Sequence, residues 1–319
     1  MDSKQEIIRK EKKPLFSKHL KFRLKRYTGI YIMLIPGIIW ALAFCYAPMY
    51  GLLIAFKDYS PSAGVWGSPW VGLKHFKALF ESDFWKIMRN TLLISVSNLV
   101  LGFPLPIMFA ILITGIKNTV FRKVTQTLSY VPHFVSWVVV SSICYVFFAP
   151  QVGFLNVALR NLGIIETSVG FLENGPMFVV MMILTNIWKG TGWSAIIYFA
   201  AIAGVDAELY EAATIDGARQ FQRTIYITIP SIMPTVVIML ILQISSILNA
   251  GFEQQMVMAN DLVWEWADVL DTYAYRYGLK LLRYSYGSAV GFFKSTVACI
   301  LLFFSNWLSR KVTGYGLYS

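Results

Sequence analysis

The residue types that most often carry catalytic or metal chemistry are few and widely separated in this chain of 319 residues. The three cysteines and three histidines show no short spacing: Cys45, Cys144, Cys299, His19, His75 and His133. Metal ligands and disulfide frameworks recur at short, regular intervals, so neither is expected. The sequence also lacks a GxxxxGK[ST] segment, and the chain therefore has no P-loop with which to bind ATP.

Polar residues inside long apolar stretches are the stronger candidates, because a polar group there is costly unless it faces water or a polar partner. Lys189 lies near the middle of the stretch 176–202 and is followed by Gly190 and Gly192. This pattern predicts a locally broken helix, where exposed backbone and a cation could meet a solute. An equally good interpretation is that the glycines allow close helix packing and that Lys189 pairs with an acid or a carbonyl.

A second polar series lies in and after the stretch 227–250. Gln243, Ser246, Asn249 and Glu253 recur at helical spacing, so one helix face is predicted to be polar from its middle to its end. Such a face looks either onto a water-filled pathway or onto a partner helix. We favour the pathway.

The elements that must position these residues are transmembrane helices. Hydrophobic residues make up 56% of the chain and charged residues 14%, and the mean hydropathy is +0.57. These values exclude a disordered protein and argue against an ordinary soluble enzyme. Six apolar stretches can each cross a bilayer as a helix: 29–56, 91–115, 128–149, 176–202, 227–250 and 287–308. The predicted fold class is an all-α integral membrane protein with six transmembrane helices.

The net charge of +11 would suit a nucleic-acid binder, but its distribution indicates orientation in a membrane. Ten of the 28 basic residues lie within the first 26 positions. With the N-terminus inside, the inner segments hold 17 basic residues and the outer loops 9. The bias predicts N-in and C-in, with a basic cytoplasmic tail over 1–28, a six-helix domain over 29–310 and a cytoplasmic C-terminal tail over 311–319. No nucleic-acid partner is expected.

Two outer loops are rich in aromatic residues. Residues 65–85 mix tryptophan and phenylalanine with charges, as expected of a segment that lies on the outer leaflet. Residues 261–286 contain two tryptophans and five tyrosines. This second loop suits either a membrane-interface belt or a docking surface for an extracellular partner.

The loop 203–226 predicts a helix-turn-helix that projects into the cytoplasm. Asp206 is a credible N-cap, so a short helix should begin at Ala207. Gly217 supplies the left-handed conformation that ends such a helix. A second helix from about 218 would then run on toward the fifth span.

This loop resembles the EAA motif of permease subunits of bacterial ABC importers. The motif has the form EAA, three residues, Gly, nine residues, Ile-x-Leu-Pro, and it is matched here by Glu211, Ala212, Ala213, Gly217, Ile227 and Pro230. Only Ile229 departs from it, where leucine is usual.

Further segments are similar to sugar-uptake permeases, above all to the group that imports oligosaccharides such as aldouronates and pectin fragments. They are Trp70 to Leu73, Trp188 to Trp193, Leu209 to Ala218 and Leu270 to Tyr273. The resemblance implies a multi-pass protein of the bacterial cytoplasmic membrane that performs no bond chemistry.

The resemblance also implies a set of partners. A second, homologous permease forms a heterodimer with this chain, two ATPase subunits bind below, and an extracellular binding protein delivers the oligosaccharide. ATP and Mg²⁺ belong to the ATPase subunits, and this chain holds no cofactor. The residues implied in ATPase coupling are Glu211, Ala212, Ala213, Asp216, Gly217 and Phe221.

For a sugar solute, the polar residues of the spans acquire specific roles. The amides of Gln243 and Asn249 suit hydroxyl groups, and Trp188 and Trp193 offer flat apolar surfaces. In the sixth span a stripe of small residues, Ser288, Gly291, Ser295 and Ala298, is predicted to pack against another helix.

Lys294 lies next to this stripe. Together with Lys189 it forms a pair of uncompensated cations that would attract an anionic sugar such as a uronate. Two alternatives remain: an ABC permease for a non-sugar solute, and a membrane-embedded transferase.

Overall fold

The computed structural model describes residues 26–81 and 83–317, so the predicted basic tail lies, up to residue 25, outside the described residues. The chain divides into two compact units, residues 1–53 and 54–319. In the first unit, helix α2 (Thr28–Ala41) is followed by a π-helical turn (Leu42–Tyr46). A 3-10 helix (Ala47–Phe56) continues the chain into the second unit.

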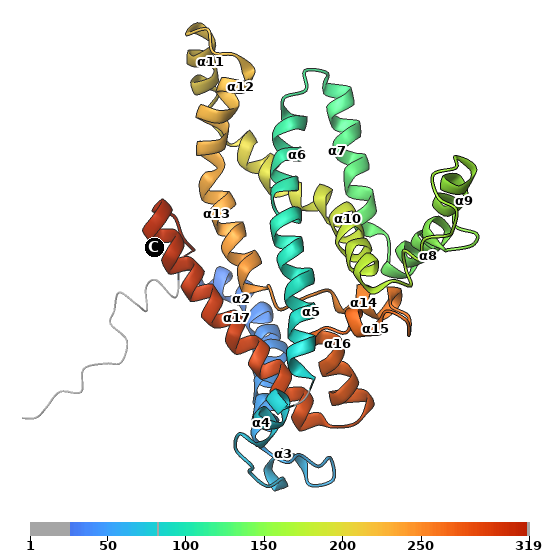
Figure 1. The fold of residues 1–319 in the computed structure, drawn as a ribbon. Coiled ribbons are helices and arrows are strands. Elements are labelled where there is room, and N and C mark those ends of the chain that lie inside the picture. Colours follow the sequence, from blue (N-terminus) through green and yellow to red (C-terminus); the bar gives the residue numbers. More distant parts are fainter. Residues whose placement is uncertain (1–25, 82, 318–319) are drawn as a thin grey trace, which may run out of the picture. The chain divides into compact units, whose positions relative to one another are not determined.

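The second unit is built on long helices (Figure 1). Helix α5 (Phe84–Ser97) continues through a π-helical turn into α6 (Pro104–Thr114). The single long helices α10 (Gly175–Ala203) and α17 (Tyr284–Thr313) follow later in the chain. Helix α12 (Gln220–Arg223) passes through another π-helical turn into α13 (Ile229–Ser245).

The third predicted span, 128–149, is not a single helix. Helix α7 (Thr119–Phe134) and helix α8 (Trp137–Phe148) meet at an angle of 99°. Pro132 lies in the last turn of α7, and the Ser136 side chain accepts a hydrogen bond from the Val139 amide and so caps α8. The chain therefore stops one helix and starts another within the predicted span.

The short helices lie in the connections: α3 (Gly64–Gly67), α4 (Lys74–Glu81), α9 (Phe154–Asn161), α11 (Ala207–Ile215), α14 (Phe252–Met258), α15 (Trp264–Ala267) and α16 (Leu270–Tyr275). Among the described residues the β structure is limited to an isolated bridge between Lys57 and Trp70. Four helical segments are long and apolar enough to cross a membrane, and up to six if each bent pair counts as one span. The prediction of an all-helical membrane protein is confirmed for this part of the chain, whereas its sidedness stays a prediction.

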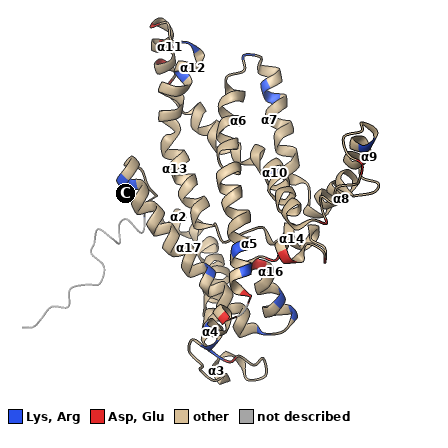
Figure 2. Cartoon of the chain, viewed as in Figure 1, with Lys and Arg blue, Asp and Glu red and all other residues tan. Residues whose placement is uncertain are grey.

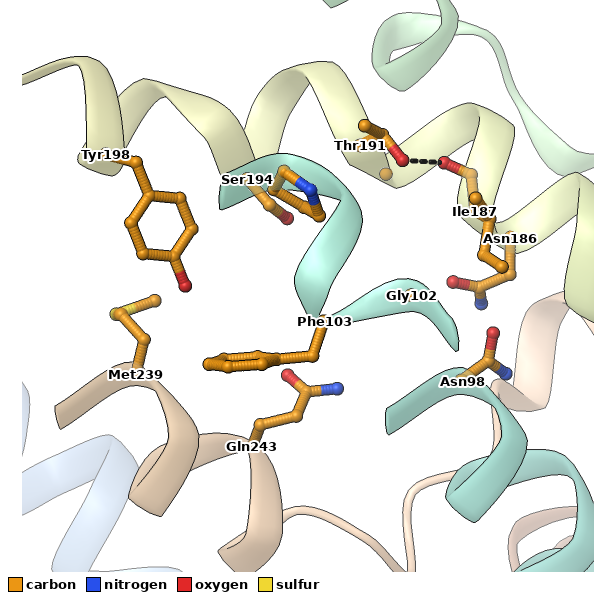
Figure 3. A pocket seen from close by; sticks show the side chains of 12 residues that line it. Asn98, Gly102, Phe103, Asn186, Ile187, Thr191, Ser194, Tyr198, Met239 and Gln243 are labelled. Atoms are coloured by element: carbon orange, nitrogen blue, oxygen red, sulfur yellow. Dashed lines mark hydrogen bonds between the residues drawn. The ribbon is translucent and has the colours of Figure 1, made fainter. Parts of the chain in front are cut away.

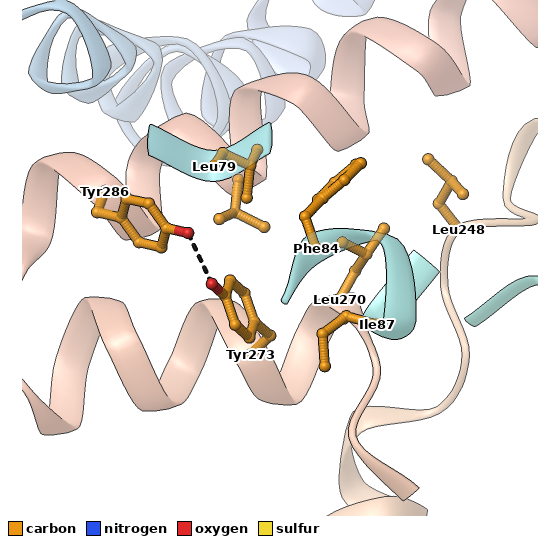
Figure 4. Close-up of a cluster of buried hydrophobic side chains, with 8 residues drawn as sticks. Leu79, Phe84, Ile87, Leu248, Leu270, Tyr273 and Tyr286 are labelled. Carbon is orange, nitrogen blue, oxygen red and sulfur yellow. Dashed lines mark hydrogen bonds between the residues drawn. The ribbon is translucent and has the colours of Figure 1, made fainter. Parts of the chain in front are cut away.

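The two aromatic loops form a core rather than only a surface layer. Leu79 and Phe84 pack with Tyr273 and Tyr286, and all four side chains are buried (Figure 4). The hydroxyl groups of Tyr273 and Tyr286 lie 2.6 Å apart. Within the segment 65–85 the three tryptophans are exposed, whereas Leu79 and Phe84 are buried. Its position on the outer leaflet stays a prediction.

Asn90 joins this loop region to helix α5. Its side chain is fully buried, and its amide donates hydrogen bonds to the carbonyl oxygens of Glu265 (2.8 Å) and Asp268 (3.1 Å). Because a buried amide must find partners, these bonds fix the 259–269 segment against the start of the span.

Candidate functional site

The predicted helix-turn-helix is present in the structure. Helix α11 begins at Ala207, and the Asp206 side chain accepts a hydrogen bond from the Glu208 amide at 3.0 Å. At the other end Gly217 has φ +77°, the Gly217 amide donates to Thr214 O and the Ala218 amide donates to Ala213 O. This pair of hydrogen bonds, together with a left-handed glycine, is the Schellman motif that ends a helix.

The loop exposes a mixed acidic and apolar surface. Glu211, Ala212, Asp216, Gly217 and Phe221 are exposed and Ala213 is half-buried. Among the described residues, the Glu211 carboxylate has no basic group within ion-pair distance. The Phe221 side chain is 74% exposed and that of Ile215 87%. Exposed large apolar side chains next to an unpaired carboxylate are typical of a docking surface.

Lys189 does not lie at a helix break. Helix α10 is continuous through Gly190 and Gly192, so the prediction of a broken helix is wrong. The Lys189 ammonium donates to the carbonyl oxygen of His133 and lies 5.4 Å from the centre of the Trp137 ring. The break between α7 and α8 leaves the last carbonyls of α7 without helical partners, and Lys189 satisfies one of them.

Close packing explains one of the two glycines. A Cβ atom at Gly192 would lie 1.9 Å from the Ser129 carbonyl oxygen, so only glycine lets α10 approach α7 there. Trp193 stacks on the His133 ring with 4.4 Å between ring centres, and both Trp193 and Trp188 remain about half exposed. Gly190 is different, because a Cβ atom there would meet no atom within 4 Å.

The positive charge of Lys294 has a negative partner within the chain. Its ammonium forms an ion pair with the Asp271 carboxylate of α16. The prediction of two uncompensated cations is therefore wrong for Lys294, which pairs with an acid from the loop 251–286. Lys189 has a hydrogen-bond partner in the third predicted span, but that partner is a neutral carbonyl.

The polar face predicted for the fifth span ends early. Helix α13 stops at Ser245, and Ser246 is its C-cap. Asn249 lies in the following turn and Glu253 on α14, where it is exposed. The prediction of one continuous polar face is wrong beyond this point, because left-handed Gly251 redirects the chain between the two helices.

Gln243 instead lines a polar recess between α5–α6, α10 and α13 (Figure 3). The recess has a volume of about 120 Å³ and gathers three amides, from Asn98, Asn186 and Gln243, and three hydroxyl groups: Thr191, Ser194 and Tyr198. Gly190 also lines it. The carbonyl oxygen of the Asn98 side chain is buried without a hydrogen-bond donor.

The sequence reasoning missed Asn98, Asn186 and Ser194. Each is a polar residue inside a predicted apolar span, which is the same signal that identified Lys189 and Gln243. Their convergence depends on the packing of α6 against α10 and was not visible in any single helix. Lys189, Trp188, Trp193, Ser246 and Glu253 lie outside the lining of this recess.

A second cavity, of about 340 Å³, lies between the end of α13, α16 and α17. Asn249, Asp271 and Lys294 line it together with Gly291, Ser295 and Ala298 of the small-residue stripe. A Cβ atom at Gly291 would meet nothing within 4 Å. Within this chain, that part of the stripe borders a hollow rather than a packed helix.

Basic residues lie at both ends of the second unit (Figure 2), but the two ends differ in how these residues are paired with carboxylates. Among the described residues, four lysine or arginine side chains pair with a carboxylate and His75 lies 4.0 Å from Asp58, and all of these contacts lie in or beside the loops that contain α4, α15 and α16. In one of them the Lys86 ammonium contacts Glu265 at 2.6 Å and holds the pKa of that carboxyl below its usual value. At the other end, the basic residues of α7 and α12 have no such partners among the described residues.

Comparison with known proteins places the chain in a family. Residues 102–314 match the model of the binding-protein-dependent transport system inner membrane component. Protein LplB of Bacillus subtilis (strain 168) is 45% identical over 296 residues, which cover 92% of each chain. The polygalacturonan/rhamnogalacturonan transport system permease protein YteP of the same strain is 42% identical over 313 residues, covering 98% of this chain and 96% of that protein.

Two solved structures are also similar. The chain matches a bacterial ABC transporter involved in the import of the acidic polysaccharide alginate, with a TM-score of 0.83 and 39% identity over 93% of this chain and 100% of that chain. The alginate transporter in complex with an alginate pentasaccharide-bound periplasmic protein gives a TM-score of 0.84 and 38% identity, covering 94% and 100%. The chain belongs to the family of binding-protein-dependent transport system inner membrane components, and it is a membrane permease subunit of an ABC transporter rather than an enzyme.

Proposed function

We propose that this permease subunit takes up uronate-containing oligosaccharides, delivered by an extracellular binding protein, as half of a heterodimer driven by two ATPase subunits. The observation that carries the proposal is the similarity over more than nine-tenths of the chain to YteP and to the alginate importer. Both are named for acidic polysaccharides. The non-sugar permease and the transferase are not supported by these relatives.

The recess around Asn98, Asn186 and Gln243 is the part of this chain proposed to meet the sugar. Amides and hydroxyl groups both donate and accept hydrogen bonds, which matches the hydroxyl groups of a pyranose ring. A recess of about 120 Å³ is too small to hold an oligosaccharide by itself. The rest of the pathway is therefore assigned to the second, homologous permease.

The surface from Glu211 to Phe221 is proposed to dock on an ATPase subunit, which holds ATP and Mg²⁺. Helix α12 runs without interruption into α13, from Gln220 to Ser245. With a rise of about 1.5 Å per residue, the distance along this helix from Gln220 to Gln243 is about 35 Å. One helix thus connects the docking surface to the recess, so a displacement of the docked loop reaches the sugar-facing residues.

The proposal is tested with the importer reconstituted in proteoliposomes together with its partner permease, ATPase subunits and binding protein. Uptake and ATP hydrolysis are measured with galacturonate oligomers and with a neutral arabino-oligosaccharide of equal length. We expect ATP-dependent uptake of the acidic oligomer with clear preference over the neutral one. Equal uptake of the two oligomers would contradict the proposed preference for acidic sugars. If neither oligomer were taken up but an amino acid or phosphate were, the assignment to sugars would be wrong.

A further inference from the structure

A third cavity lies where α6 ends and α7 begins. It has a volume of about 660 Å³, is open to the surface and is bordered by α6, α7, the end of α10, α11 and α12. The two sides are joined by a hydrogen bond of 3.1 Å from the Gln220 amide to the Gly115 carbonyl oxygen. The cavity therefore lies between the helical hairpin α6–α7 and the loop that carries Glu211.

Its polar lining is strongly basic. Lys117, Arg122, Lys123 and Arg223 line the cavity, and no carboxylate does. Among the described residues none of these four cations forms an ion pair. The Arg223 guanidinium donates to the Thr214 hydroxyl at 3.0 Å, but its Nε atom is buried without an acceptor. Four unpaired cations around one hollow repel each other and favour an anion between them.

The rest of the lining is uncharged. Ile111, Phe199 and Ile202 contribute apolar side chains from the ends of α6 and α10. The neutral polar members are Thr114, Gln126, Tyr210, Gln220, Thr224 and Thr228. The cavity thus combines four cations with apolar side chains from the ends of α6 and α10, which are also the ends of two predicted spans. A soluble anion would gain nothing from these apolar side chains, whereas a lipid places its phosphate and its first acyl carbons in such surroundings.

We infer that this cavity binds the phosphate headgroup of an anionic phospholipid. Arginine matches phosphate oxygens with two parallel hydrogen bonds, and Arg122 and Arg223 come from the two sides of the cavity. A bound phosphate would therefore bridge α7 and α12 and hold the docking loop against the α6–α7 hairpin. The inference goes beyond the proposed function, because it concerns the lipid and not the transported solute.

The experiment uses the assembled importer purified in mild detergent. Phosphatidylglycerol or phosphatidylcholine is added, and lipid retention is measured by native mass spectrometry together with the thermal midpoint. The variant is Arg122→Gln/Lys123→Gln. The matched control is Arg310→Gln/Lys311→Gln, which removes the same two residue types from the last turn of α17. A cation that contacts the lipid phosphate contributes roughly a fivefold change in affinity, whereas Arg310 and Lys311 do not line the cavity and are not expected to contact this phosphate.

We expect wild type and control to retain phosphatidylglycerol in preference to phosphatidylcholine, and the variant to bind it roughly 30-fold more weakly. Equal weakening in the control would show general surface attraction and overturn the site. Wild-type retention by the variant, or full displacement of the lipid by millimolar inorganic phosphate, would also overturn it. If the double variant does not assemble, Lys117→Gln, at an exposed position, is expected to weaken binding roughly fivefold.

Discussion

Lys189 and Lys294 show how single cations are accommodated inside the spans. Lys189 donates to a carbonyl at the end of α7, and Lys294 pairs with the half-buried carboxylate of Asp271. Both contacts lie within the chain. The lysines therefore stabilise the packing of helices, and the preference for acidic sugars is assigned to neither of them.

The Lys294 ion pair gives a prediction at this scale. Lys294→Met leaves Asp271 unpaired and should lower the free energy of unfolding by roughly 2 kcal/mol, less than for a fully buried pair because both side chains are about one-fifth exposed. The double variant Lys294→Met/Asp271→Asn should recover most of this loss. Thermal unfolding checks both variants. If the stable double variant selectively lost uptake of acidic oligosaccharides, Lys294 would have to be assigned to the substrate pathway after all.

Gly190 gives a second prediction. A leucine there would extend into the recess beside Gln243, where no atom lies within 4 Å of a new Cβ. Gly190→Leu should leave folding intact and reduce uptake at least tenfold, because the side chain fills most of about 120 Å³. Gly37→Leu adds the same bulk at another open helical position and is the control. Unchanged uptake in Gly190→Leu would exclude the recess from the pathway.

At the scale of elements, the Schellman ending of α11 sets the shape of the proposed docking surface. Gly217 and Gly314 both follow a helix with φ +77° and have open space around the Cβ position. Replacing either by alanine should cost about 1 kcal/mol of backbone strain. The two glycines differ in position: Gly217 lies in the loop 203–226, whereas Gly314 ends α17.

We therefore expect Gly217→Ala to reduce transport and binding-protein-stimulated ATP hydrolysis several-fold, while Gly314→Ala does not. The assay is paired measurement of uptake and hydrolysis in proteoliposomes. Equal activity of the two variants would contradict the role of this loop in coupling. Equal loss in both would indicate a general effect of strain on folding.

Asn90 illustrates how a buried polar side chain joins a span to the loop that contains α15. Asn90→Ala removes the donor to two backbone carbonyls and should lower the free energy of unfolding by about 1–3 kcal/mol. Asn249→Ala removes an exposed amide and should change it by less than about 0.5 kcal/mol. Denaturation of the purified variants compares the two. Equal stability of the two variants would mean that these hydrogen bonds do not hold the loop.

At the scale of the whole molecule, sidedness is the property that the charge pattern predicts most directly. The loop 116–127 should lie inside and the loop 251–286 outside. After replacement of Cys45, Cys144 and Cys299, a cysteine at Lys117 should react with a membrane-impermeant maleimide only in permeabilised cells. A cysteine at Lys280 should react in intact cells. The opposite pattern would reverse the N-in topology.

Local patterns made the docking loop predictable. Asp206, Ala207 and Gly217 act through neighbours within a few residues, so the cap, the helix start and the left-handed turn all follow from the sequence. The span 128–149 was not predicted as two helices, because its length and average hydropathy suit a single helix and neither property reveals a bend. The local signals of the bend are the cap at Ser136 and the position of Pro132.

The sequence by itself determined the apolar spans, the bias of charge between their ends and the helix-turn-helix, because hydropathy, charge and helix capping are local properties. The tertiary structure alone decided the partners of Lys189 and Lys294, the convergence of Asn98, Asn186 and Gln243, and the basic cavity around Arg122 and Arg223. Each of these depends on distances between residues far apart in the chain. Such distances are set by how whole helices pack, which no single stretch of sequence encodes.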